Sequence, residues 1–481
     1  MVVSGTTRRA VLAAGPAVLA AAPVGAAPPP TYDRVFTTRH EGVFNGRRLV
    51  YDAMVEPTVL TGAAGQPTAR FVGAEGPTAG KRPVIFAFAG GPSNAATAYH
   101  MRLLGPRRIM EPPPGADPSD FTLTDNRSSV LDVADVVLVD TAETGFSRIL
   151  PAGDRRAFYS LNGDTRSIEQ FMAAWLKAHD RESSPRYVMG GSYGSVRAIR
   201  IGWDLRQSAP VDGVIMTANS SMIREMTGVI GQAAGLPPMT MTALYHGKIA
   251  RNGRSDAEVA DDAYTFAMGA YLPALARVQD LSFAARAHLA DELEAFTGIS
   301  GAVFLDSDLE LGDGQFSSLL LKDRGLVLDD RLDGRSAVPV GQSAKPDGAE
   351  RALFDTYMRD ELGVTYPMSE YRSAAPDTGS WTFQGPNGEP RNDWSKLLRE
   401  QMAANPRMRV LSANGYYDLT SSFGQARQLF SRTRLPRDRI TVREYPGGHA
   451  LYQTPDTAAR LSQDIRDMLA ARTGVDHDHD A

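Results

Sequence analysis

Short apolar runs alternate along the chain with segments of helical periodicity. Four runs in the first half are bounded by glycine or polar residues and predict buried strands, at 82–91, 133–147, 186–191 and 212–219. Apolar side chains recur every three or four positions at 167–180, and a second helix is predicted to follow the strand at 186–191. Strands and helices that alternate in this way predict a mostly parallel sheet covered by helices on both faces.

The pattern differs on both sides of this block. Residues 42–60 alternate between apolar and polar side chains and predict an antiparallel strand pair with a turn at Asn45–Gly46. After residue 219 the alternation of strands and helices is lost, and it returns with strands predicted at 408–418 and 439–450 around a helix. The predicted organisation is therefore a core made of two segments, 32–219 and 395–473. A mainly helical cap, 220–394, is inserted between them.

The N-terminal segment 1–27 has the pattern of an export signal. An arginine pair precedes an apolar run of about fifteen residues that ends in small residues and prolines. A membrane anchor is the alternative, but the run is shorter than the ~20 apolar residues that span a bilayer and is interrupted by Pro16. We predict export by the twin-arginine route, cleavage near Ala26 or Ala27, a periplasmic or extracellular location and no membrane span afterwards. The acidic, histidine-containing tail 474–481 is predicted to be disordered.

Composition narrows the class of protein. The 481 residues are 42% hydrophobic and 22% charged, which is typical of a soluble globular protein. The formal net charge of −5 comes from intermixed signs and does not indicate binding to nucleic acid. The absence of cysteine excludes disulfides, zinc–thiolate sites and a thiol nucleophile, and we expect no cofactor. A large core does not need disulfides even in an exported protein, and the sequence does not indicate the oligomeric state.

The most specific chemical motif is Gly190-Gly191-Ser192-Tyr193-Gly194, which follows a predicted strand and precedes a predicted helix. In this context a G-x-S-x-G sequence forms a sharp turn that exposes the serine hydroxyl at the carboxyl edge of a sheet. The alternative is a purely structural glycine turn, but no other serine in the chain has the full pattern. We predict that Ser192 is a nucleophile.

A serine hydroxyl becomes an effective nucleophile when a base removes its proton, and an acid must orient that base. Among the eight histidines, His449 follows the last predicted strand on a glycine loop, which can carry its imidazole over the sheet edge. Asp418 ends the preceding predicted strand, although it could also begin a helix. The order Ser192, Asp418, His449 is that of α/β-hydrolases, and we predict that fold.

A tetrahedral intermediate also needs hydrogen-bond donors for its oxyanion. We predict two backbone N–H groups, one from Tyr193, directly after the serine, and one from Gly91, in the loop after an early strand. Five further residues near these segments are predicted to line a substrate pocket: Ala89, Gly90, His100, Gly191 and Arg197.

Together these segments resemble the serine carboxypeptidase family, peptidase family S10, with its bacterial and acyltransferase-like relatives. AGGPSNAATAYHMRLLGP is similar to the family's NGGPGSSS segment, and LDVADVVLVDTAETGFSR to its D-x-P-x-G-T-G-F/Y-S region. GGSYGS stands where the family has GESYGG, and NGYYDLTSS and YPGGHALY resemble its aspartate and histidine motifs. The resemblance covers the core on both sides of 220–390. It implies a serine-type carboxypeptidase that acts through an acyl-enzyme.

Two departures from the family pattern bear on the substrate. The family binds a terminal carboxylate with an asparagine and a glutamate, where this chain has Ala89 and Gly191. A carboxylate entering such a pocket loses hydration without gaining these partners, at a cost of roughly 1–3 kcal/mol or more, which argues against exopeptidase action by the usual mechanism. Arg197 or Arg102 could supply a replacement charge, but solvation on a helix face is the favoured interpretation. Without the glutamate, we expect activity to rise as His449 becomes neutral, at about pH 6–7.5.

We therefore predict an exported serine hydrolase that cleaves a peptide or a related amide or ester. The alternatives are an acyltransferase or esterase acting on small metabolites, and a binding protein that retains the fold without the chemistry. The acidic stretch 306–318 resembles a calcium loop only in part, because Leu311 and Ser317 occupy its glycine and glutamate positions. We predict an ordinary acidic turn there and no metal site.

Overall fold

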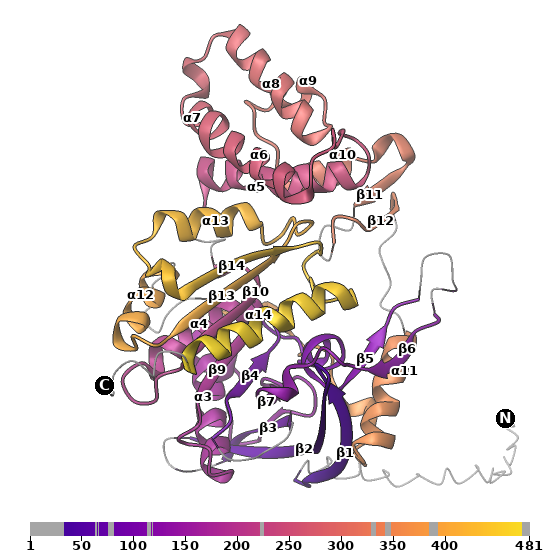
Figure 1. Cartoon of the computed structure of the whole chain (residues 1–481), viewed down its shortest axis with the longest axis vertical. Coiled ribbons are helices and arrows are strands. Elements are labelled where there is room, and N and C mark those ends of the chain that lie inside the picture. The colour runs from indigo at the N-terminus through magenta and orange to yellow at the C-terminus, as the bar shows by residue number, and fades with distance from the viewer. Residues whose placement is uncertain are drawn as a thin grey trace, which may run out of the picture. The chain divides into compact units, whose positions relative to one another are not determined.

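A ten-stranded, mostly parallel sheet forms the centre of the described chain (Figure 1). The computed structural model describes residues 33–473 except 63–64, 66, 76–80, 113–116, 118, 222–225, 329–332, 342–347 and 384–392. Six neighbouring strands are parallel, in the order β7 (Asp135–Val139), β4 (Val84–Phe88), β9 (Arg186–Ser192), β10 (Gly213–Asn219), β13 (Arg409–Gly415) and β14 (Ile440–Tyr445). Beyond β7 the sheet continues with antiparallel strands, namely β3 (Pro67–Glu75), β2 (Arg47–Thr61) and β1 (Phe36–Phe44), and β8 (Arg148–Ile149) pairs with β3.

The pattern of apolar residues accounts for these strands. β4, β7 and β10 are buried at every position, as expected for apolar runs that are covered on both faces. β1 alternates in burial and pairs with β2 across the predicted turn, where Asn45 and Gly46 have φ values of 48° and 78°. Positive φ at both central residues is the conformation that tight hairpin turns require.

Helices cover both faces of the sheet, and alternate residues of β4 belong to two separate apolar clusters. On one face, α3 (Leu161–Ala178), α4 (Tyr193–Leu205) and α12 (Trp394–Ala404) pack through apolar side chains such as Phe171 and Leu398. On the other face, α14 (Pro455–Thr473) packs through Ile465. A mostly parallel sheet between two helical layers, interrupted by a helical insertion, confirms the predicted α/β-hydrolase fold.

The strand predicted at 133–147 is shorter than expected: β7 begins at Asp135 and ends at Val139. The residues that follow form a loop, in which Ser147 Oγ donates to the carbonyl of Asp140 at 2.7 Å. The Asp140 carboxylate accepts the N–H of Ala96 at 2.8 Å, and burial raises the pKa of this carboxyl group to about 6. This bond joins the loops after β4 and β7, so the end of the strand depends on a segment that is distant in the sequence.

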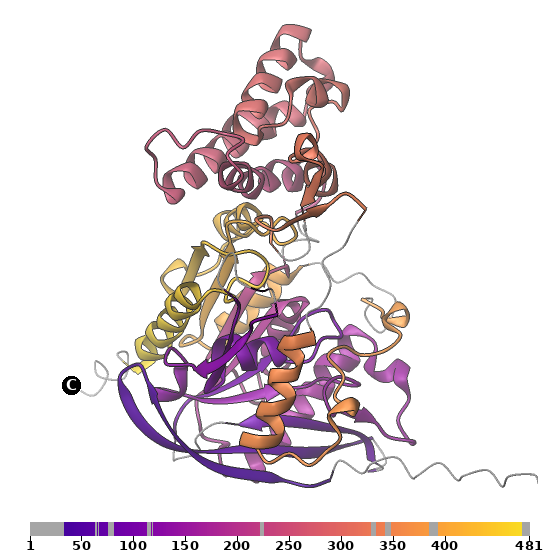
Figure 2. The same cartoon turned by 90° about the vertical axis from the view of Figure 1, so that its right-hand side faces the viewer.

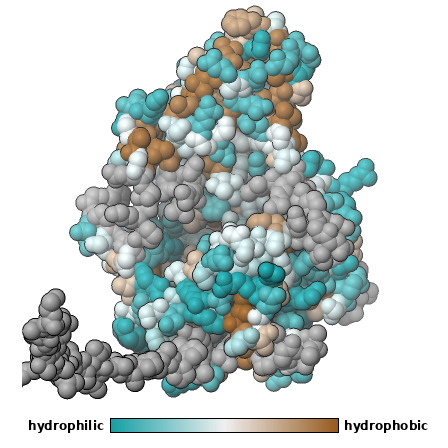
Figure 3. All heavy atoms as spheres, turned by 180° about the vertical axis from the view of Figure 1, so that it is seen from behind, coloured by the Kyte–Doolittle hydropathy of each residue, from teal (hydrophilic) through white to brown (hydrophobic). Residues whose placement is uncertain are grey.

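The insertion after β10 begins with helices that share an apolar core of their own (Figures 1 and 2). These helices, which we call the cap, include α5 (Gly228–Tyr245), α6 (Asp256–Phe266), α8 (Phe283–Thr297) and α10 (Asp313–Leu319). α5 is buried along most of its length and contacts α13 (Phe423–Arg432) of the core. Met241 of α5 packs with Tyr416 and Tyr417, which directly precede Asp418. Apolar residues are also exposed on the cap when it is seen from behind (Figure 3).

The later part of the insertion packs against the core. α11 (Gly348–Thr356) and the residues after it place Phe354 and Tyr371 in the apolar cluster on the α14 face of the sheet. An isolated backbone bridge also joins Asn94 to Ala374. The segment 220–394, predicted as one mainly helical cap, therefore contains both the cap helices and a stretch that belongs to the packing of the sheet.

The predicted export signal 1–27 and the tail 474–481 lie outside the described residues, and both remain predictions. Within the part of the chain that the structure describes, no helix combines the length and the apolar character that a membrane crossing requires.

Candidate active site

Ser192 lies on a sharp turn between β9 and α4. Its φ is 54° and its ψ is −127°, a conformation that non-glycine residues adopt rarely and at an energetic cost. Gly190 and Gly194 are needed because neither position has room for a side chain. A Cβ on Gly190 would lie 2.0 Å from the carbonyl oxygen of Gly194, and one on Gly194 would lie 2.9 Å from that of Ala89. The strand, sharp turn and helix expected around the G-x-S-x-G sequence are therefore present.

His449 and Asp418 are joined by a hydrogen bond, with 3.0 Å between His449 Nδ1 and Asp418 Oδ2. The Asp418 side chain is fully buried, and its Oδ1 accepts the backbone N–H groups of Thr420 and Ser421 at 3.0 and 2.8 Å. The side chain of His449 remains 19% exposed. Both carboxylate oxygens thus have fixed partners, and the imidazole is held through Nδ1, which leaves Nε2 for proton transfer.

The loops that carry Asp418 and His449 touch each other closely. Gly415, the last residue of β13, has no room for a side chain, because a Cβ there would lie 2.2 Å from the carbonyl oxygen of Gly447. The N–H of Tyr417 donates to the same carbonyl at 3.0 Å. The two loops are therefore in direct contact through their backbones, in addition to the contact between the Asp418 and His449 side chains.

Arg108, which the sequence analysis did not single out, holds the far end of the His449 loop. Its Nη2 donates to the carbonyl of Tyr452 at 2.9 Å and also to that of Gln453. Arg108 is buried, and burial lowers the pKa of its guanidinium to about 10. No local pattern could have identified this role, because Tyr452 and Gln453 lie more than three hundred positions away in the sequence.

Ser192 lies at the same edge of the sheet as the other two residues. β9, β10, β13 and β14 are parallel neighbours, and Ser192, Asp418 and His449 stand at or just after the carboxyl ends of β9, β13 and β14. Among the hydrogen bonds of the described residues, none joins Ser192 Oγ to His449. Bonds of this kind often tighten only when substrate binds.

The protonation of His449 is governed by two opposing effects. Burial lowers the pKa of the imidazole, whereas the charge of Asp418 and its hydrogen bond raise it. The effect of Asp418 prevails, so the pKa of His449 lies above the ordinary value of 6.5. A base must be neutral to accept a proton, so this shift moves the pH range in which His449 can act as a base upward.

The loop after β4 lies directly against the turn at Ser192. A Cβ on Gly90 would be 2.8 Å from Ser192 Cβ and 3.1 Å from the backbone nitrogen of Tyr193. Gly91 has a φ of 112°, which glycine adopts readily and other residues do not. Tyr193 is the first residue of α4, so its N–H has no acceptor within the helix. Both residues predicted to bind the oxyanion thus belong to segments that meet beside Ser192.

Two side chains leave no room for a side chain at position 191, where the resemblance noted in the sequence would place a glutamate. A Cβ on Gly191 would lie 2.5 Å from Tyr99 Oη and 2.7 Å from Thr217 Oγ1. These two hydroxyl groups are buried and are hydrogen-bonded to each other at 2.5 Å. Ala89 is partly exposed. The glycine at 191 is therefore part of a packed arrangement, which the sequence did not reveal.

Arg197 and Arg102 do not lie on solvated helix faces, and that interpretation was wrong. Arg197 is fully buried and pairs with Asp164, with 2.5 Å between Nε and Oδ2. Arg102 is also buried and pairs with Glu111 and Glu350 at 2.8 and 3.0 Å. Because both guanidinium groups are engaged with carboxylates, neither offers a free charge to a substrate carboxylate.

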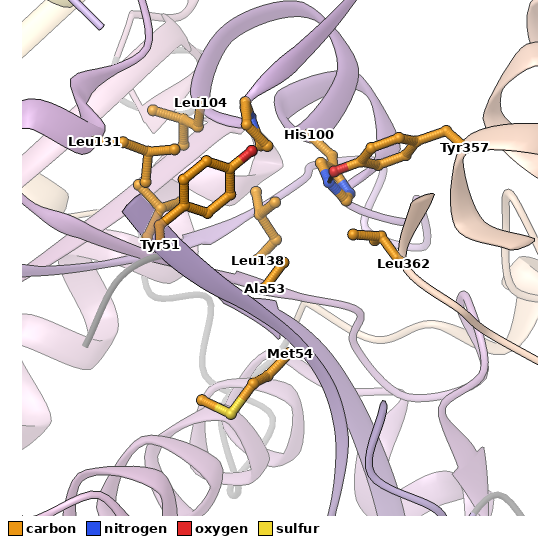
Figure 4. A pocket seen from close by; sticks show the side chains of 12 residues that line it. Tyr51, Ala53, Met54, His100, Leu104, Leu131, Leu138, Tyr357 and Leu362 are labelled. Atoms are coloured by element: carbon orange, nitrogen blue, oxygen red, sulfur yellow. Dashed lines mark hydrogen bonds between the residues drawn. The ribbon is translucent and has the colours of Figure 1, made fainter. Parts of the chain in front are cut away.

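His100 lines a small cavity within the core, and the residues that line this cavity do not include Ser192 (Figure 4). The cavity has about 20 Å³ of space for the centre of a water-sized sphere, enough for one water molecule. His100 Nε2 lies 3.3 Å from Tyr357 Oη, and Tyr51 contributes to the same lining. Burial lowers the pKa of His100 to about 4, so its imidazole is neutral at pH 7.

The acidic stretch 306–318 contains the end of α9 (Gly301–Asp306) and most of α10. Asp308 and Leu309, between these helices, have positive φ values of 52° and 68°. Among the described residues, no group of three histidine, aspartate or glutamate side chains is arranged to hold a metal ion.

Comparison with known proteins gives no family: no family model matches the sequence, and no curated protein matches it. Solved structures resemble it at low similarity. A carboxylesterase from Nitrososphaera gargenis is 9% identical, with a TM-score of 0.39 over 87% of this chain and 99% of that one. A loop variant of a haloalkane dehalogenase from Bradyrhizobium elkanii is 12% identical, with a TM-score of 0.36 over 92% and 99%. A homoserine O-acetyltransferase from Staphylococcus aureus is 12% identical, with a TM-score of 0.35 over 86% and 95%. With values this low, the fold is assigned from the strand order itself, and no activity is inferred from these structures.

Proposed function

We propose that this protein is a serine hydrolase that acts through an acyl-enzyme, with Ser192 as nucleophile, His449 as base and Asp418 as the acid that orients the base. One observation carries the proposal. The 3.0 Å hydrogen bond between His449 Nδ1 and Asp418 Oδ2 lies at the sheet edge where Ser192 stands on a strained turn. Backbone strain of this kind is typical of functional sites, where it is maintained at a cost in stability.

The proposed reaction has two steps. In the first, His449 Nε2 takes the hydroxyl proton of Ser192 as Oγ attacks the substrate carbonyl, and the backbone N–H groups of Gly91 and Tyr193 donate to the oxyanion. His449 then gives this proton to the leaving group, which departs as the acyl-enzyme forms. In the second step, His449 takes a proton from a water molecule as the water oxygen attacks the acyl carbon. The ester bond to Ser192 Oγ then breaks, Oγ receives the proton from His449, and the acyl group leaves as an acid.

We propose a peptide, or a related amide or ester, as the substrate, which is the substrate class of the S10 serine carboxypeptidases that the sequence resembles. Ala89 and Gly191 have no polar side chain, and Arg102 and Arg197 are engaged with carboxylates. Recognition of a free C-terminal carboxylate is therefore not part of the proposal. The pattern of 1–27 supports export by the twin-arginine route, so that the enzyme acts in the periplasm or outside the cell.

A fluorophosphonate probe tests the proposed chemistry, because it reacts with activated serines. We expect the full chain to be labelled on the peptide that contains Ser192, and the label to be lost in Ser192→Ala. Ser147→Ala is the control and should keep the label, because Ser147 Oγ donates to the carbonyl of Asp140 in a structural loop. An unlabelled wild type would contradict the proposal and favour a binding protein. A label that persists in Ser192→Ala would also contradict it, because another residue would then be the reactive nucleophile.

A substrate panel then separates hydrolysis from acyl transfer. Peptides with blocked and free C-termini are compared with aryl esters, in the presence and absence of an added amine or alcohol. We expect blocked peptides and esters to be hydrolysed at least as fast as free peptides. A strong preference for free C-termini would contradict the proposed substrate class, and product formed mainly on the added acceptor would indicate an acyltransferase.

A further inference from the structure

The guanidinium group of Arg197 binds two carbonyls of the loop after β4, one just before Gly90 and one just after Gly91. Nη1 donates to the carbonyl of Ala89 at 2.5 Å, and Nη2 donates to the carbonyl of Pro92. Arg197 is on α4 and is fully buried. The bond to Pro92 is buried and the bond to Ala89 is partly buried, and removal of a donor from a buried carbonyl leaves that carbonyl without a partner.

These bonds determine where the N–H groups of the loop point. In a trans peptide unit the C=O and N–H groups point in opposite directions. Because Arg197 binds the carbonyl of Ala89, the N–H of Gly90 in the same unit is directed away from Arg197. In the next unit the carbonyl of Gly90 accepts the N–H of Asn94 at 3.1 Å, so the N–H of Gly91 is directed away from Asn94. The loop cannot turn these N–H groups without breaking hydrogen bonds.

The same guanidinium group is anchored on α3 and touches the residue after Ser192. Asp164 is buried and pairs with Arg197 through two bonds, Nε to Oδ2 at 2.5 Å and Nη2 to Oδ1 at 3.1 Å. The central carbon of the guanidinium lies 4.9 Å from the centre of the Tyr193 ring. A planar guanidinium has five donors on three nitrogen atoms and can reach two carbonyls and a carboxylate that lie in different directions, whereas the three donors of an ammonium group share a single nitrogen atom.

We infer that Arg197, anchored by Asp164, is a positioning residue for the oxyanion site and holds the loop of Gly90 and Gly91 against Tyr193. This inference rests on the proposed serine hydrolase function. Arg197 does not touch the reacting atoms, so its loss acts on the stabilisation of the transition state and leaves ground-state binding of the substrate nearly unchanged. The expected signature is a lower kcat with a similar KM.

Arg197→Lys tests the inference, since lysine keeps a positive charge beside Asp164 but cannot bind both carbonyls as well. The substrate is p-nitrophenyl acetate, and phenylboronic acid serves as an analogue that forms a tetrahedral adduct with the serine. We expect kcat to fall about tenfold to 100-fold, because small displacements in an oxyanion site have effects of this size. The affinity for phenylboronic acid should fall in proportion, and KM should change less than about twofold.

Arg181→Lys is the matched control. Arg181 is also buried and paired with a buried aspartate, Asp135, and its Nη2 donates to the carbonyl of Arg82 at 2.7 Å. Asp135 is the first residue of β7, at the amino edge of the parallel strands and opposite the edge of Ser192. Both lysine variants should lose stability, but only Arg197→Lys should lose kcat and affinity for phenylboronic acid.

Each outcome bears on the inference. If Arg197→Lys does not fold, as judged by circular dichroism and thermal melting, Asp164→Asn is measured in the same way, because it loosens the anchor and retains Arg197. An unchanged kcat and boronate affinity in the folded variant would overturn the inference and leave the proposed function intact. An equal loss in Arg181→Lys would also overturn it, because the effect would then reflect stability alone. A wild type without turnover and without fluorophosphonate labelling would overturn the proposed function, and the inference with it.

Discussion

The imidazole Nδ1 of His449 lies 3.0 Å from Oδ2 of Asp418, across the space between two loops that follow neighbouring parallel strands. The other oxygen of Asp418 is held by the backbone N–H groups of Thr420 and Ser421. The carboxylate is fully buried, so it cannot leave this position without giving up all three donors. It therefore orients the imidazole and favours its protonated form.

Asp418→Asn should lower kcat by about 10⁴-fold, because an amide neither stabilises the imidazolium nor selects the right tautomer. The pKa of His449 should also fall, since burial, which lowers it, would no longer be offset by the charge of Asp418. Activity requires the neutral imidazole, so the acid limb of the kcat/KM profile should move to lower pH. Asp464→Asn, which changes an aspartate that binds Tyr445 Oη, is the control and should leave the limb unchanged. A limb that stays in place in Asp418→Asn would contradict the assignment of His449.

Gly191→Glu introduces the glutamate that the resemblance to S10 carboxypeptidases would place at this position. We expect it to destabilise the protein by roughly 1–3 kcal/mol without creating carboxypeptidase activity. The reason is that the space is taken by the hydroxyl groups of Tyr99 and Thr217. Urea unfolding measures the loss. Gly269→Glu is the control, because no atom lies within 4 Å of a Cβ at this exposed position of the cap. Equal stability of the two variants would show that the site at 191 can open.

His100 should make the folded state less stable in acid. Burial lowers the pKa of His100 from 6.5 to about 4, so the unfolded chain binds a proton at this residue between these values and the folded protein does not. Stability should fall as the pH decreases through this window, by roughly 3 kcal/mol in total from this residue. Urea unfolding between pH 7 and 4 should show a smaller loss in His100→Gln. The control is His288→Gln, at a side chain that is 76% exposed, and it should follow the wild type. Identical slopes for His100→Gln and the wild type would contradict this account.

Arg108→Lys should weaken the hold on the loop that carries His449, because an ammonium group cannot replace the bonds to the carbonyls of Tyr452 and Gln453. We expect kcat for an aryl ester to fall about tenfold, with a smaller change in KM. Arg439→Lys is the control, since Arg439 also binds backbone carbonyls, including that of Pro406 at 2.8 Å, but at the start of β14. A similar decrease in both variants would point to a general loss of stability.

Much of the fold could be predicted because a strand that is buried on both faces has a continuous run of apolar residues. The buried strands β4, β9, β10 and β13 each correspond to an apolar run. The hairpin of β5 (Arg107–Met110) and β6 (Thr122–Asp125) was not predicted, because these strands are short and partly exposed and their residues are mixed in polarity.

By itself the sequence determined the succession of strands and helices, the crowded glycine turn at Ser192, and the places of Asp418 and His449 after their strands. These features depend on residue spacing and on local steric limits, which a linear pattern records. Only the tertiary structure decided that Arg197 binds the carbonyl of Ala89, 108 positions away, and that His100 lies in the core. Contacts of this kind arise when several elements pack at once, so no single stretch of the chain contains the information for them.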